Sequence, residues 1–103
     1  MKLHMQSIHF DADQKLLDFI KKKSTKLDTY FDRIIDGEVF LRLDKDEHME
    51  NKIVEIKLNI PGSSLFVKEQ GRTFESATDL AIEGLQRQLK KFKEKQLEKR
   101  KVV

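Results

Sequence analysis

The first third of the chain changes from strand-like to helix-like spacing of its apolar residues. Residues 2–10 carry apolar side chains among polar ones, which predicts a first strand. From residue 14 to about residue 31 the apolar positions share one face of a helix, so we expect an amphipathic helix with Asp13 as its N-cap. Ser24 lies on that apolar face. Lys23 projects from the apolar side, so its stem must pass the core to reach water or a ligand.

Three strand patterns follow this helix. Asp36-Gly37 opens a strand that continues to residue 43, residues 53–60 alternate regularly, and residues 65–69 return after a turn at 61–64. An acidic turn at 44–50 connects the first two of these strands. Because polar residues occupy one side of the resulting antiparallel meander, only its other face needs to be covered.

The last predicted helix begins after Thr73, which can cap it. Its apolar residues recur at spacings of three and four, and they are Phe74, Ala77, Ala81, Ile82, Leu85, Leu89 and Phe92. Residues after Gln96 have little to bury, so we expect a basic, frayed tail over 96–103.

The predicted element order is therefore β-α-β-β-β-α. The economical packing places both helices on the apolar face of one four-stranded sheet, which gives an α+β two-layer sandwich. A chain of 103 residues has no room for a second core. We expect a single domain over residues 1–95.

The net charge of +3 is distributed unevenly. Residues 1–83 carry 13 Lys or Arg and 16 Asp or Glu, a sum of −3, whereas residues 84–103 carry 8 and 2, a sum of +6. This asymmetry indicates a partner dense in negative charge, and a solvated helical tail is the alternative explanation. Two helices lying side by side would bring Lys22 and Lys26 to the same surface as the basic face of the last helix.

The sequence offers no convincing catalytic or metal site. It contains no cysteine, which excludes a disulfide framework, a thiolate zinc site and thiol catalysis. His4 and His9 would point to opposite faces of a strand, and the faint calcium-loop pattern at Asp44, Asp46 and His48 lacks its turn glycine and closing glutamate. Phosphate-binding glycine loops and serine elbows are also missing. We expect no enzyme activity, metal, cofactor or small-molecule substrate.

With membrane binding and sequence-specific readout disfavoured, the remaining function is binding of folded RNA. No apolar run approaches the roughly 18 residues that cross a bilayer, and no secretory signal begins the chain, so we expect a cytoplasmic protein without membrane partners. There is no helix-turn-helix spacing and no aromatic RNA-reading signature on a central strand. Lysine and arginine would then recognise RNA by its shape and phosphates.

Two motifs in this order carry a family resemblance. Residues 23–33 read KSTKLDTYFDR, which is similar to a K-x-x-K-L-x-x-Y-F stretch, and residues 85–95 read LQRQLKKFKEK, which is similar to L-x-R-Q-L-x-K-x-K-x-K. Both stretches, with the turn at 59–62, resemble the ribosome hibernation-promoting factor and ribosome-associated inhibitor family over about residues 1–95.

The resemblance implies a fold akin to double-stranded RNA-binding domains and a role in translation. Members bind the small ribosomal subunit and its rRNA in the channel for mRNA and the A- and P-site tRNAs, so they block translation and preserve idle ribosomes under stress in stationary phase. By motif match the RNA-contacting residues would be Lys23, Lys26, Arg87, Lys91, Lys93 and Lys95. Helical geometry alone adds Lys22 and Lys90.

The chain resembles a short-type member, without the C-terminal domain that long-type members use to pair ribosomes, and we expect it to be monomeric when free. Gly84 stands where the family usually has lysine, and Ser24 replaces a larger apolar residue. A hypothesis of another class is a protein-interaction module that binds an acidic protein through its basic helical face or a sheet edge.

Overall fold

The computed structural model describes residues 1–45 and 50–101, with side chains as far as residue 97. Its elements follow in the order β1 (Lys2–Ser7), α1 (Gln14–Thr25), the 3-10 helix η1 (Lys26–Thr29), β2 (Asp36–Leu43), β3 (Lys52–Ile60), β4 (Ser63–Gly71) and α2 (Phe74–Lys101). This order confirms the predicted β-α-β-β-β-α succession.

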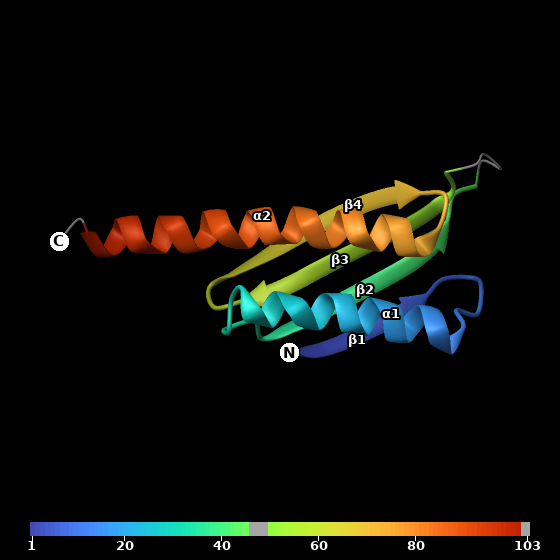
Figure 1. Cartoon of the computed structure of the whole chain (residues 1–103), viewed down its shortest axis with the longest axis horizontal. Coiled ribbons are helices and arrows are strands. Elements are labelled where there is room, and N and C mark those ends of the chain that lie inside the picture. The colour runs from blue at the N-terminus through green and yellow to red at the C-terminus, as the bar shows by residue number, and fades with distance from the viewer. Residues whose placement is uncertain (46–49, 102–103) are drawn as a thin grey trace.

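The four strands form one mixed sheet in the order β1-β2-β3-β4 (Figure 1). The meander of β2, β3 and β4 is antiparallel, with Val39 opposite Ile56 and Ile56 opposite Val67. β1 runs parallel to β2, with Met5 opposite Val39. Parallel neighbours need a crossover connection, and α1 provides it.

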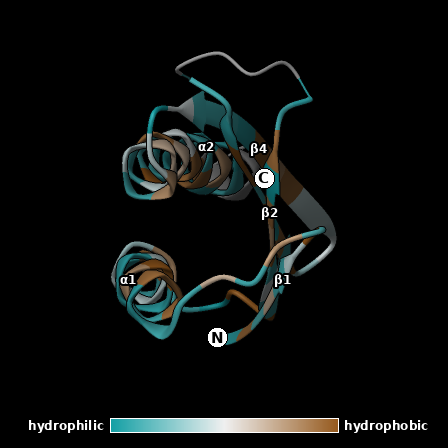
Figure 2. Cartoon of the chain, turned by 90° about the vertical axis from the view of Figure 1, so that its right-hand side faces the viewer, coloured by the Kyte–Doolittle hydropathy of each residue, from teal (hydrophilic) through white to brown (hydrophobic). Residues whose placement is uncertain are grey.

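Both helices cover the same face of the sheet, as Figure 2 shows. Alternate residues of β2 and β3, such as Val39, Leu41, Ile56 and Leu58, are fully buried beneath them. The helices contribute Ile20, Leu85 and further apolar residues to this single core. The predicted α+β two-layer sandwich is confirmed.

Helix α1 begins as predicted but ends earlier. The Asp13 carboxylate accepts a hydrogen bond of 2.8 Å from the backbone N–H of Leu16 and so caps the helix. The regular helix ends at Thr25 instead of continuing to about Phe31, because the next four residues wind into the tighter η1. Phe31 nevertheless reaches the core, where 8% of it is exposed.

Ser24 lies in the core, on the face where the sequence placed it. It is fully buried, and its hydroxyl has no hydrogen-bond partner among the described residues. A buried hydroxyl without a partner loses its hydration and gains nothing in return. Ser24 is therefore a point of weakness in the packing of α1.

Helix α2 begins with the predicted cap. The Thr73 hydroxyl accepts a hydrogen bond of 3.0 Å from the backbone N–H of Ser76, and the Ser76 hydroxyl donates to the Thr73 carbonyl over 3.0 Å. The helix continues to Lys101 and extends past the sheet (Figure 1). The division between a domain ending at residue 95 and a frayed tail after it stays a prediction.

The end of the first strand differs from the prediction, and the faint calcium-loop pattern lies mostly outside the described residues. β1 ends at Ser7 rather than at residue 10, and His9 follows it with a φ of 64°, so His9 is not a strand residue. Phe10 instead stacks on Phe74, with 5.1 Å between the ring centroids. The calcium-loop pattern lies mostly in residues 46–49, outside the described residues.

Candidate nucleic-acid interface

The two helices lie side by side and begin at the same end of the sheet (Figures 1 and 2). The last turn of α1 and the following η1 consequently lie beside the middle of α2, and η1 contacts it. The basic motif of the first helix and that of the second therefore meet on the helical layer. The sequence alone does not give the crossing angle of the two helices, on which this arrangement depends.

Lys23 joins the two helices. Its Nζ lies 3.5 Å from Oδ1 of Asp79 on α2 and 5.5 Å from the centroid of the Phe19 ring on α1. The side chain is 33% exposed, which confirms that its stem passes the apolar side of α1 on the way to water. Lys23 thus serves as an internal contact in the free protein.

Lys22 and Lys26 present their charges to solvent. Lys22 lies in the last turn of α1 and Lys26 begins η1, and both are exposed. Among residues 1–45 and 50–97, neither ammonium group makes a hydrogen bond or an ion pair. Positive charge at the carbonyl end of a helix is stabilising, so the helix tolerates this clustering of lysines.

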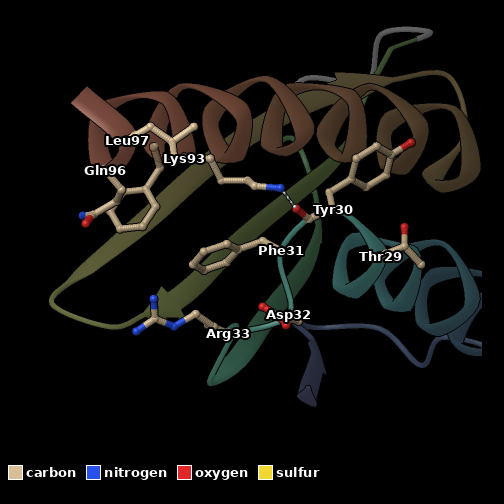
Figure 3. A pocket seen from close by; sticks show the side chains of 9 residues that line it. Thr29, Tyr30, Phe31, Asp32, Arg33, Lys93, Gln96 and Leu97 are labelled. Carbon is tan, nitrogen blue, oxygen red and sulfur yellow. Dashed lines mark hydrogen bonds between the residues drawn. The ribbon is translucent and has the colours of Figure 1, made fainter. Parts of the chain in front are cut away.

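The candidate residues of α2 are all exposed, and they are Arg87, Lys90, Lys91, Lys93 and Lys95. Lys93 is the one that bonds to another element in the part of the chain that the structure describes. Its Nζ donates a hydrogen bond of 2.9 Å to the main-chain oxygen of Tyr30, the C-cap residue that follows η1 (Figure 3). A cation at this carbonyl end stabilises η1 and holds it against α2.

The cations of α2 divide between its two flanks. Arg87, Lys90 and Lys93 line a cavity of about 530 Å³ together with Tyr30. Lys91 lines a different cavity of about 290 Å³ beside β4, which Arg87 also reaches. Lys95 is exposed and lines neither of these cavities. The structure therefore brings part of the predicted set together and leaves Lys91 on the β4 side.

The β4 flank is closely packed at Gly84. A Cβ atom at this position would lie 3.2 Å from Cγ2 of Val67. Beside this contact, Nε2 of Gln88 donates a hydrogen bond of 2.9 Å to the carbonyl of Phe66 on β4. The glycine that departs from the family pattern thus permits a close approach of α2 to the sheet.

Acidic side chains share this surface with the cations. Glu83 and Glu94 line the 530 Å³ cavity, and Asp79 faces Lys23. The interface is not uniformly positive. Its exposed ammonium and guanidinium groups can bind phosphates, while its carboxylates can accept hydrogen bonds from donors on the same ligand.

Tyr30 and Arg33 are not among the candidate residues that the sequence predicts. A helical projection through residue 31 places Tyr30 on the apolar face, but the helix tightens at Lys26 and Tyr30 is 49% exposed. Arg33 lines a neighbouring cavity of about 420 Å³ with Phe31 and Lys93 (Figure 3). The change of helix type has no clear signature in the sequence that would have revealed either residue.

Within the described residues, no group of three or more His, Asp or Glu side chains is arranged to hold a metal ion. In the same residues no helix is long and apolar enough to span a membrane.

The chain matches a family model described as sigma 54 modulation protein / S30EA ribosomal protein over residues 3–97. It is 31% identical over 96 residues to the ribosome hibernation promoting factor of Pseudomonas putida, a match that covers 93% of this chain and 90% of that protein.

Two solved structures have a similar fold. A ribosomal subunit interface protein from Coxiella burnetii superposes with a TM-score of 0.81 at 24% identity, covering 90% of this chain and 98% of that one. The N-terminal domain of Protein Y from Thermus thermophilus gives a TM-score of 0.77 at 26% identity, covering 89% and 99% respectively. The first of these likenesses concerns the fold alone.

Proposed function

Because the chain belongs to the sigma 54 modulation protein / S30EA ribosomal protein family, we propose that it is a ribosome hibernation factor. It binds the small ribosomal subunit in the channel for mRNA and the A- and P-site tRNAs, and its occupancy there keeps idle ribosomes inactive and intact. The observation that supports this proposal is that the two helices carrying the basic motifs pack side by side on one face of the sheet.

The cations have two roles in this proposal. Lys22, Lys26, Arg87, Lys90, Lys91 and Lys95 neutralise rRNA phosphates, since their charges face solvent. Binding releases the counterions condensed on the RNA, which supplies much of the affinity without reading sequence. Lys23 and Lys93 hold α1 and η1 against α2 in the free protein. The phosphate-binding groups are therefore in position before the protein binds the ribosome, which lowers the entropic cost of binding.

The proposed function requires no chemistry beyond binding. The protein acts by occupying a site in proportion to its amount, in the cytoplasm where ribosomes work, and it needs no cofactor. Free protein is monomeric, and its partners are the small subunit and the rRNA within it.

Sedimentation through a sucrose gradient with purified bacterial small subunits tests this proposal. We expect the wild-type chain to migrate with the subunit at moderate salt and the Arg87→Ala/Lys91→Ala variant to stay near the top. The matched control is Lys57→Ala/Lys68→Ala, which removes the same charge from exposed residues of β3 and β4 on the opposite face.

Wild-type protein that remains at the top of the gradient contradicts the proposal. Equal loss of binding in the variant and in its control would show that net charge, and not the helical surface, directs the interaction.

A further inference from the structure

The side chain of Tyr30 is an exposed aromatic group within the proposed RNA-binding surface. Tyr30 is the only tyrosine of the chain, and 49% of it is exposed at the junction between η1 and the following loop. It lines the cavity of about 530 Å³ with Arg87, Lys90 and Leu97, and Leu97 is itself 56% exposed. This volume lies within the range of about 300–1,000 Å³ typical of ligand-binding clefts.

We propose that Tyr30 is a stacking platform for one unpaired base of single-stranded RNA, whose flanking phosphates bind Arg87 and Lys90. The proposal rests on the proposed function and adds to it a contact with a base. Every base has an aromatic face, so the contact tolerates any sequence. A base inside a duplex has no free face, so the site selects unpaired nucleotides.

The chemistry of the cavity fits a nucleotide better than a bare anion. Tyr30 and Leu97 offer apolar surface that a phosphate ion cannot use. Glu83 and Glu94 line the same cavity, and their carboxylates would repel an anion but accept hydrogen bonds from the amino and imino groups of a base. The apolar side chains thus match the face of a base, the carboxylates match its edge, and the cations match the phosphates of the same nucleotide.

The platform is held in place before binding. The Tyr30 carbonyl accepts the hydrogen bond from Lys93 (Figure 3), and the Tyr30 N–H donates to the Leu27 carbonyl over 3.0 Å. The next residue, Phe31, is buried against Phe92, with ring centroids 5.6 Å apart in an edge-to-face arrangement. The backbone on both sides of the exposed ring is therefore anchored, which lowers the entropic cost of binding a base.

The decisive experiment compares a short fluorescein-labelled oligoadenylate with a strand of the same length and charge that lacks all of its bases. We expect the intact strand to bind more tightly, and Tyr30→Leu to abolish this difference. Tyr30→Leu should weaken binding of the intact strand by about 5- to 150-fold, the fold-change that corresponds to ~1–3 kcal/mol for a stacked base. Tyr30→Phe, which keeps the ring, should bind like the wild type.

Two further measurements separate stacking from a structural effect. The single tyrosine gives one set of ring signals in a proton NMR spectrum, and we expect these signals to move upfield when oligoadenylate binds to the full chain. The Tyr30→Leu loss should be the same factor at low and high salt, because stacking releases no counterions. Phe66→Leu, at an aromatic residue of β4 that is 54% exposed on the opposite face, should leave binding unchanged.

Equal affinity for the intact and base-lacking strands, unmoved tyrosine signals, or undiminished binding by Tyr30→Leu would each overturn the proposal. Sedimentation with small subunits in the same buffer distinguishes the two possible failures. If wild-type protein still binds the subunit, only the stacking contact is refuted, whereas loss of subunit binding refutes the proposed function itself.

Discussion

Removing two cations from α2 should change how steeply ribosome binding depends on salt. Of the eight candidate cations, Lys23 and Lys93 make internal contacts, whereas the other six make no side-chain hydrogen bond or ion pair among the described residues. If these six each neutralise one phosphate, the log of affinity should fall with the log of salt at a slope of about −4 to −5. The Arg87→Ala/Lys91→Ala variant should reduce this slope to about −3 to −4.

These slopes predict that the wild type and the double variant lose affinity by clearly different factors as the salt concentration rises. Between 50 and 200 mM salt, wild-type affinity should fall roughly 300- to 2,000-fold, whereas that of the double variant should fall only about 50- to 150-fold. Filter binding of labelled protein to purified small subunits measures both losses of affinity. The magnesium concentration is held constant so that the subunits stay intact.

The control removes two charges from the sheet face opposite the helices. Lys57→Ala/Lys68→Ala changes the net charge equally but leaves the helical surface untouched, so its slope should match the wild type. A double variant whose slope equals that of the wild type would refute the assignment of Arg87 and Lys91. A control that flattens the slope just as much would refute the claim that the helical side binds the phosphates.

The internal contacts give three predictions on stability, each measurable by urea denaturation followed by circular dichroism. Ser24→Ala should raise the free energy of unfolding by ~1–3 kcal/mol, because it removes a buried hydroxyl that has no partner within the described residues, and a loss of stability would contradict this reasoning. A double-mutant cycle of Lys23→Gln and Asp79→Asn should show a favourable coupling of about 0.2–1 kcal/mol, and zero coupling would mean that the pair contributes nothing. Gly84→Ala should be better tolerated in a Val67→Ala background than in the wild type, so strict additivity would exclude the close contact.

The sequence predicted the layers of the fold because periodicity reports burial directly. The alternation of Val54, Ile56, Leu58 and Ile60 marks the covered face of β3, and all four are buried. The pairing of β1 was left open by the sequence, since a strand's own pattern does not reveal whether its neighbour runs parallel. The position of that strand is instead set by the α1 crossover to β2.

The end of the first helix was harder to predict than its start. Asp13 caps α1 through its own side chain, which is a local interaction that a sequence displays. After the helix tightens at Lys26, Phe31 and Ile34 are buried in the core, and such burial is a tertiary effect that the local sequence does not display. Projection of a continuous helix therefore placed the Tyr30 ring on the wrong side.

For the candidate interface, charge predicted which residues are exposed but not what each one contacts. Lys22 and Lys23 are neighbours with the same side chain, yet Lys22 faces solvent while Lys23 pairs with Asp79. Likewise Lys91 lies toward β4, whereas Lys93 bonds to Tyr30. These differences follow from the placement of α1 beside α2, which depends on the packing of the core and not on the local sequence.

Competition for the decoding channel of the small subunit is the sharpest test of the proposed function. Labelled protein is bound to purified subunits, and mRNA with initiator tRNA is then added in increasing amounts while the bound fraction is measured by filtration. We expect the two ligands to exclude each other, so that the protein is displaced and, at high concentration, blocks tRNA binding in turn. Simultaneous binding of protein, mRNA and tRNA to one subunit would contradict the proposed function.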